Sequence, residues 1–172
     1  MTQRGVSLDQ ILALRQAEAG PVVNVDEPML KLVIVSVGEQ GFAFHGDKIV
    51  EILADCPVYF LPGCPDSLEG VINVRGDIES VISLRSILAQ PESAPGPDSR
   101  ILLARTAAMR SGVRVDRVDD VLDVPLSAIL PPLTTLPAPL RDVALGLVTL
   151  REQVVHLIDL DKVFDDYCTG LC

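Results

Sequence analysis

The chain has 172 residues, of which 48% are hydrophobic and 3% aromatic, and its formal net charge at pH 7 is -10. Such a charge would be repelled by a phosphate backbone or an anionic bilayer, so nucleic-acid binding is not expected. Residues 1–20 contain no basic stretch followed by an apolar run, and no window approaches the ~20 apolar residues of a membrane span. The sequence therefore predicts a cytoplasmic protein with no direct membrane insertion.

The hydrophobic residues are mostly aliphatic, and many are β-branched, which favours strands over helices. The four cysteines form no CxxC pair, and only two histidines are present. A structural zinc site is therefore not expected, and we predict no metal and no cofactor.

In chain order, residues 7–10 (SLDQ) resemble a helix-capping box, and Gly20 with Pro21 would end the helix that follows. This amphipathic helix would either pack on the body of the protein or recruit a partner. Residues 29–37 and 42–44 then predict a β-hairpin around a glycine-bounded turn.

The next apolar segments continue this pattern. We expect a helical turn leading into a strand over residues 47–52, and two strands within residues 70–88 joined at Gly76 and Asp77. A Pro-, Ser- and Gly-rich stretch near residues 90–99 separates two halves. In the second half we expect a turn near residues 110–112, and strands over the following ranges: 100–105, 113–118, 121–124, 144–150 and 153–157.

The second half is a degenerate copy of the first. Residues 32–35 (LVIV) match residues 101–104 (ILLA) at an offset of 69, and residues 70–75 (GVINVR) match residues 146–151 (GLVTLR) at an offset of 76. Ordered matches at two constant offsets indicate a domain-sized duplication. Five short strands in each half predict a small barrel in each half.

Few residues could carry catalysis. His45 and His156 lie at alternating positions of predicted strands, with no Ser or Cys in an activating motif beside them. Glycine-rich phosphate-binding motifs are absent. The acidic pairs at residues 119–120 and 165–166 are adjacent in sequence, which points their side chains apart on a strand and favours a solvated surface.

Residues 73–76 (NVRG) leave two interpretations open. If the segment is a strand, Asn73 and Arg75 project to the face opposite Ile72 and Val74. The pair is then either part of a solvated turn or an anchor for a protein partner, because Arg is enriched among interface hot spots.

Four runs together resemble the CheW family of chemotaxis coupling proteins: residues 49–52 (IVEI), residues 61–62 (LP), residues 70–76 (GVINVRG), and residues 81–84 with position 83 left out (VI-x-L). The resemblance continues through residues 112–118 and 146–164, and covers residues 29–166. It implies an all-β fold of two packed five-stranded SH3-like barrels, with short helices. It also implies a non-enzymatic adaptor between a CheA-type histidine kinase and the cytoplasmic tips of chemoreceptors.

Carried over by position, the resemblance implies kinase binding by Ile49 and Glu51. It implies receptor binding by Asn73, Arg75 and Gly76. The chain departs from the family pattern where the family usually has Pro and Asp, since Ser80 and Ser83 stand there.

We therefore expect an adaptor whose two barrels present separate faces to the regulatory domain of the kinase and to the receptor, recruited to membrane-associated receptor arrays. The expected organisation is an N-terminal extension (1–28), a CheW-like domain (29–166) in which the two repeat copies interleave, and a C-terminal tail (167–172). The alternative is a ligand-binding or catalytic domain that uses the groove between the barrels. The pathway could be flagellar chemotaxis, pilus motility or another receptor pathway.

Overall fold

The computed structural model of the protein describes residues 27–54 and 56–170. The helix predicted from Ser7 lies outside these residues. Within them the chain is mainly β-strand, as its aliphatic composition predicts. None of the described helices is both long enough and apolar enough to cross a bilayer.

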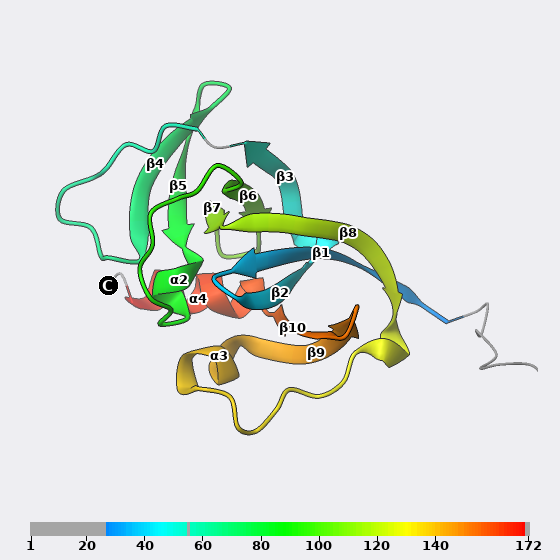
Figure 1. Cartoon of the computed structure of the whole chain (residues 1–172). Helices are drawn as coiled ribbons and strands as arrows, with labels where there is room; N and C mark the ends of the chain where they lie inside the picture. Colours follow the sequence, from blue (N-terminus) through cyan, green and yellow to red (C-terminus); the bar gives the residue numbers. More distant parts are fainter. Residues whose placement is uncertain (1–26, 55, 171–172) are drawn as a thin grey trace, which may run out of the picture.

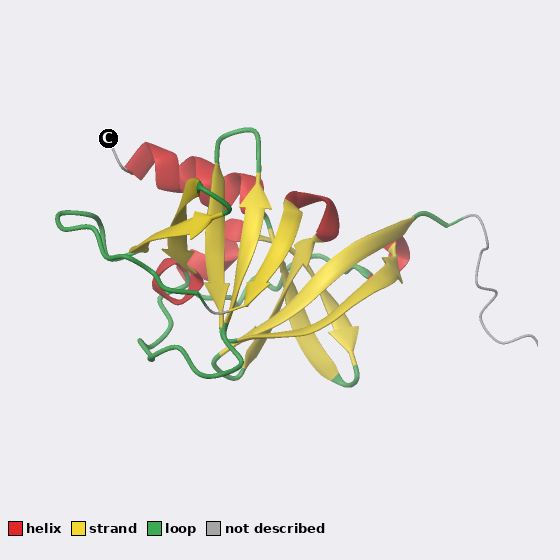
Figure 2. Cartoon of the chain, turned by 90° about the horizontal axis from the view of Figure 1, so that it is seen from above, coloured by secondary structure: helices red, strands yellow, loops and turns green. Residues whose placement is uncertain are grey.

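The first half contains β1 (Met29–Val37), β2 (Gln40–His45), a short 3-10 turn η1 (Gly46–Lys48), β3 (Ile49–Ala54), β4 (Leu68–Val74), β5 (Asp77–Ser83) and α2 (Leu84–Ile87). The second half contains β6 (Arg100–Arg105), β7 (Arg110–Val115), β8 (Arg117–Pro125), η2 (Leu126–Ala128), α3 (Ala138–Val143), β9 (Ala144–Leu150), β10 (Gln153–Ile158) and α4 (Leu160–Gly170). Helix α4 therefore runs beyond residue 166. Figure 2 shows it lying along one side of the strands.

One predicted turn is wrong. Arg110 and Gly112 lie inside β7, and the turn comes earlier, where the Thr106 hydroxyl accepts the backbone N–H of Met109 at 3.3 Å. A Cβ on Gly112 would lie 2.6 Å from the Ile101 side chain. Gly112 is therefore needed where two strands approach closely, and not for a turn. The sequence pattern alone does not distinguish these two roles of glycine.

The strands form two five-stranded sheets, which we name barrel 1 (β8-β1-β2-β10-β9) and barrel 2 (β3-β6-β7-β5-β4). Figure 1 shows barrel 2 at the upper left and barrel 1 at the lower right. The two-barrel architecture is confirmed, but the expectation that each half closes its own barrel is wrong. Strands β1 and β2 of the first half pair with β8 and β10 of the second, and β3 to β5 pair with β6 and β7. The hydrophobic pattern fixes which face of a strand is buried, and it does not specify the partner strand.

The strand registers support the duplication. Glu51 on β3 is opposite Leu103 on β6, and Asp120 on β8 is opposite Ile34 on β1. Both relationships keep the offset of 69 read from the sequence. Each barrel is thus a pseudo-symmetric copy of the other, with strands taken from both halves.

Three groups of buried side chains explain why the central strands are apolar on both faces. On β1, Leu32 and Ile34 fill the interior of barrel 1, whereas Val33 and Val35 belong to the largest cluster. That cluster also contains Leu102 of β6 and residues of α4, so it lies between the barrels. The interior of barrel 2 is filled separately by residues that include Ile72, Val74, Val81, Ile101 and Leu103.

Candidate partner-binding site

The residues predicted to bind the two partners all lie on barrel 2. Ile49 and Glu51 belong to β3, Asn73 belongs to β4, and Arg75 and Gly76 form the turn between β4 and β5. The residues carried over for both partners therefore come from one sheet.

The β4–β5 connection is a tight two-residue turn. Arg75 has φ 52° and Gly76 has φ 93°, the pair of positive values typical of a type I′ hairpin. The side-chain oxygen of Asn73 accepts the Gly76 N–H at 2.8 Å. Asn73 therefore shapes the turn, and Arg75 is a turn residue instead of the strand residue that the alternation predicts.

Arg75 forms a two-pronged ion pair with Glu51. Its Nη1 donates to Oε2 at 2.9 Å and its Nη2 donates to Oε1 at 2.5 Å. The Arg75 side chain is 75% exposed and that of Glu51 is 31% exposed. One residue carried over as kinase-binding, Glu51, is thus in direct contact with one carried over as receptor-binding, Arg75.

The ion pair changes the acidity of both groups. The Arg75 guanidinium donates hydrogen bonds to Glu51 and lowers its pKa, although partial burial opposes this and the charges of Arg75 and Arg110 add to it. The same hydrogen bonds raise the pKa of Arg75. Both groups are therefore charged at neutral pH.

Ile49 is not a free surface residue. It is half-buried and packs against the cluster between the barrels. The exposed apolar side chains of β3 are its neighbours Val50 and Ile52, at 50% and 39% exposure. Among the described strands, β3 pairs only with β6, so these side chains stand at an open sheet edge. The alternation of side chains along β3 could have indicated that Val50 and Ile52 are exposed. The family motif by itself does not show which of its residues are exposed.

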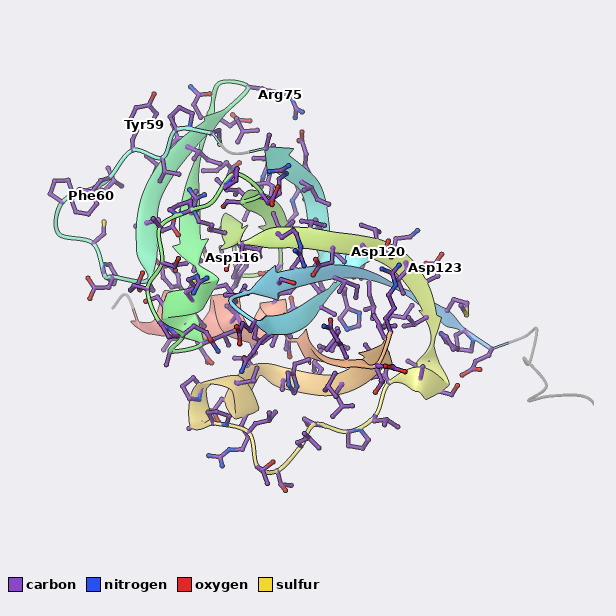
Figure 3. All side chains as sticks on the ribbon, in the orientation of Figure 1. Tyr59, Phe60, Arg75, Asp116, Asp120 and Asp123 are labelled. Carbon is purple, nitrogen blue, oxygen red and sulfur yellow. The ribbon has the colours of Figure 1, made fainter. Side chains whose placement is uncertain are left out.

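An aromatic loop beside β4 was missed by the sequence reasoning. Tyr59, Phe60 and Leu61 are 62%, 73% and 39% exposed. Two backbone hydrogen bonds, at 2.8 and 2.9 Å, hold Tyr59 to Val71 of β4. Figure 3 shows Tyr59 and Arg75 at the same end of barrel 2, with Phe60 farther along the loop. The available signal was three consecutive large apolar residues in a proline-rich loop, in a chain that has few aromatic residues.

A second ion pair in barrel 2 joins the neighbouring strands β7 and β5. Arg110 Nε lies 2.9 Å from Glu79 Oε1, with the two side chains 32% and 11% exposed. Two charged groups so close to the barrel interior stabilise one another, because either one alone would be buried without a counter-charge.

The corner after β5 is kept despite the departures from the family pattern. Ser83 caps α2 by accepting the Ser86 N–H at 3.3 Å, which is the role that an Asp would have there. Ser80 lies 2.8 Å, oxygen to oxygen, from the hydroxyl of Ser111. Ser83 therefore holds the corner, and Ser80 links β5 to β7.

Neither histidine is part of a catalytic arrangement among the described residues. His156 packs near Phe42, with ring centroids 6.3 Å apart, and burial lowers its pKa. His45 lines a cavity of about 310 Å³ together with Asp47 and Leu145, in which Lys48 is paired with Asp161 at 2.9 Å. Within the described part of the chain, no three His, Cys, Asp or Glu side chains come together as metal ligands.

Comparison with known proteins gives a consistent result. The chain is similar to a probable chemotaxis protein CheW of Rhizobium etli, with 28% identity over 146 residues that cover 84% of this chain and 94% of that protein. It is 30% identical over 130 residues to the chemotaxis protein CheW of Thermotoga maritima, covering 76% and 84% of the two chains. Protein FrzA of Myxococcus xanthus is 29% identical over 96 residues, covering 56% of this chain and 60% of FrzA.

The fold is also found in a solved structure. The crystal structure of scaffolding protein TtCheW from Thermoanaerobacter tengcongensis superposes with a TM-score of 0.69 and 26% identity, covering 77% of this chain and 90% of that one. The family model of the CheW-like domain matches residues 31–168. The duplicated sequence, the two interleaved barrels and these similarities together show that the chain belongs to the CheW-like domain family.

Proposed function

We propose that this protein is a non-enzymatic adaptor of bacterial chemotaxis-type signalling that couples a CheA-type histidine kinase to the cytoplasmic tips of chemoreceptors. The observation that carries the proposal is the match of residues 31–168 to the CheW-like domain, together with the scaffolding protein that shares the fold. Recruitment to a membrane-associated receptor array would follow from binding to the receptors.

For the kinase, we propose that the contact surface is centred on β3. Val50 and Ile52 are exposed aliphatic side chains of an edge strand, and Glu51 alternates with them and projects to the other face, where it meets Arg75. Exposed apolar side chains at a strand edge fit the apolar centre of a protein interface. Ile49 would support the strand from below through its packing.

For the receptor, we propose that Arg75 is the anchor. The two-residue turn presents the Arg75 side chain at 75% exposure. The Asn73 side chain fixes the shape of that turn by accepting the Gly76 N–H, and Gly76 adopts the positive φ that the turn requires. The nearby aromatic Tyr59 would extend the contact, because aromatic and Arg side chains are enriched in interface centres.

Binding measurements test the two assignments. Titration calorimetry of the full chain with the regulatory domain of the cognate kinase should show weaker binding for Ile52→Asp. The matched control is Val121→Asp, which changes the equivalent residue of β8 at a similar exposure of 46%. If both variants bind like the wild type while remaining folded, β3 is not the kinase surface.

The groove between the barrels gains no support as a ligand or catalytic site. Its described lining is the apolar cluster that packs the barrels together, without a converging set of nucleophile and base. The similarity to FrzA as well as to chemotaxis proteins leaves the pathway to be decided by the receptor that the chain binds.

A further inference from the structure

The two barrels carry an ion pair at equivalent positions. In barrel 1, Arg151 Nη2 lies 3.4 Å from Asp120 Oδ2. Asp120 is the repeat equivalent of Glu51 at the offset of 69, and Arg151 is the equivalent of Arg75 at the offset of 76. Arg151 also has positive φ, at 47°, so the turn that presents it is duplicated too.

The space beside this pair differs between the barrels. In barrel 2, Arg110 and Glu79 form an ion pair there, and the charge of Arg110 acts on Glu51. The equivalent positions in barrel 1 are Gly41 and Val155, which lie opposite one another on β2 and β10. Barrel 1 therefore lacks both the long cationic side chain and its buried carboxylate.

The result is a hollow of about 210 Å³, which we call the barrel 1 mouth. Its apolar wall is formed by the side chains of Ile34, Leu122, Leu150 and Val155, and its rim is charged. Figure 3 places Asp120 along β8, in barrel 1, away from Arg75 at the tip of the β4–β5 hairpin. The mouth is thus separate from the surface proposed for the kinase and the receptor.

The two carboxylates of the rim differ in their contacts. Asp119 accepts hydrogen bonds from the Ser36 hydroxyl and from Arg117 Nε. Asp120 accepts the Val121 N–H with one oxygen and faces Arg151 with the other, and that Arg151 side chain is 88% exposed. In barrel 2, Glu51 accepts two hydrogen bonds from Arg75 and also lies within the electrostatic influence of Arg110. Asp120 therefore has a weaker set of cations than its equivalent.

We propose that the barrel 1 mouth binds an arginine side chain supplied by a protein partner. The aliphatic stem would pass over Gly41 and contact Val155 and Leu122, and the guanidinium would reach Asp120. The inserted side chain would thus stand where Arg110 stands in barrel 2. The net charge of -10 favours the approach of a basic partner.

The mouth can take up a side chain, but it has nothing that would bind the main-chain groups of a free amino acid. The rim is open to solvent at Arg151 and Arg117, whose side chains are 88% and 60% exposed. The backbone of an inserted residue would remain outside, so the α-amino and carboxylate groups of free arginine would gain no buried contact there.

The experiment is an NMR titration of the isotope-labelled full chain with the blocked tripeptide acetyl-Gly-Arg-Gly-amide. We expect saturable shifts of the Gly41, Asp120 and Val155 amide signals, with a Kd on the order of 1 mM for so small a probe. Acetyl-Gly-Leu-Gly-amide should bind at least several-fold more weakly, and free arginine should bind no more tightly than the blocked Arg peptide. Asp120→Asn should weaken binding of the Arg peptide roughly tenfold, because it removes a charged hydrogen-bond acceptor. Asp123→Asn, on the same strand but outside the mouth, is the matched control.

A second variant fills the mouth from within. A Cβ at position 41 would meet its nearest neighbour, Val155 Cγ2, at 3.2 Å, so a side chain can be added with a small shift of Val155. Gly41→Arg should remain folded and lose binding of the peptide. Equal binding of the Leu and Arg peptides would show an apolar pocket only and overturn the proposal. Absence of saturable shifts in the folded wild type, or stronger binding of free arginine, would overturn it as well.

Discussion

Arg75 and Glu51 are joined by two hydrogen bonds although 24 residues separate them in the chain. The pair connects the edge strand β3 to the β4–β5 turn, and each side chain is oriented by the other. A partner that contacts either residue therefore meets a surface that depends on both. A substitution of Arg75 or Glu51 should therefore also affect the contacts that the other residue makes with a partner.

Arg75→Ala should weaken receptor binding roughly thirtyfold, as expected for truncation of a central Arg anchor. Because the side chain is exposed, the melting temperature should change little. The variant should also weaken kinase binding to a smaller extent, because Glu51 loses the partner that orients it. Receptor and kinase titrations of the same folded variant measure both effects.

Arg75→Lys is the control for charge, since Lys keeps the charge but cannot make the two-pronged contact. If Arg75→Lys retained full receptor affinity, the planar geometry of the pair would not matter. Unchanged kinase affinity in Arg75→Ala would show that Glu51 is positioned without it.

Gly76→Val should lower the free energy of unfolding by about 1–2 kcal/mol, because a β-branched residue is strained at positive φ. The added Cβ meets no atom within 4 Å, so the effect comes from the backbone and not from a clash. Gly76→Asn should be tolerated much better, since Asn adopts positive φ more readily. Chemical denaturation of the two variants compares them, and equal losses would point to a cause other than backbone strain.

Arg110→Met should destabilise the protein by about 2 kcal/mol, because it leaves the carboxylate of Glu79 nearly buried without its counter-charge. The double variant Arg110→Met with Glu79→Leu should recover most of this loss, since no unpaired charge remains. Urea denaturation of the single and double variants measures the coupling. Additive losses in the double variant would contradict a buried ion pair.

The stability of the protein should depend on the protonation of His156. Burial lowers its pKa from the ordinary value of 6.5, and its Nδ1 is buried with no hydrogen-bond partner among the described atoms. The unfolded chain therefore takes up a proton more readily than the folded one. This contribution to stability is present above the unfolded pKa and is lost as the pH falls through the folded pKa.

His156→Phe removes the titrating group and keeps an aromatic ring beside Phe42. Between about pH 7.5 and about pH 5, the free energy of unfolding of the variant should fall less steeply than that of the wild type. Parallel pH profiles would assign the slope to other groups.

Much of the local structure could be predicted from the sequence. Alternation and glycine positions predict the β1–β2 hairpin, the helical turn before β3 and the two strands around residues 75–76, because these depend on nearby residues. The constant offsets predict the duplication, which the equivalent registers of Glu51 and Asp120 support. The positive φ of Gly76 follows from the tight hairpin in the same way.

Only the tertiary structure decided which strands pair and which distant side chains meet. The apolar residue pattern of β1 indicates that both of its faces are buried. It does not indicate that its neighbour is β8 and not another strand of the first half. For the same reason, contact between Glu51 and Arg75, or between Arg110 and Glu79, could not be predicted from residue spacing. The hollow beside Gly41 likewise exists because a residue without a side chain lies at one end of barrel 1. This is a property of the packing and not of the local sequence.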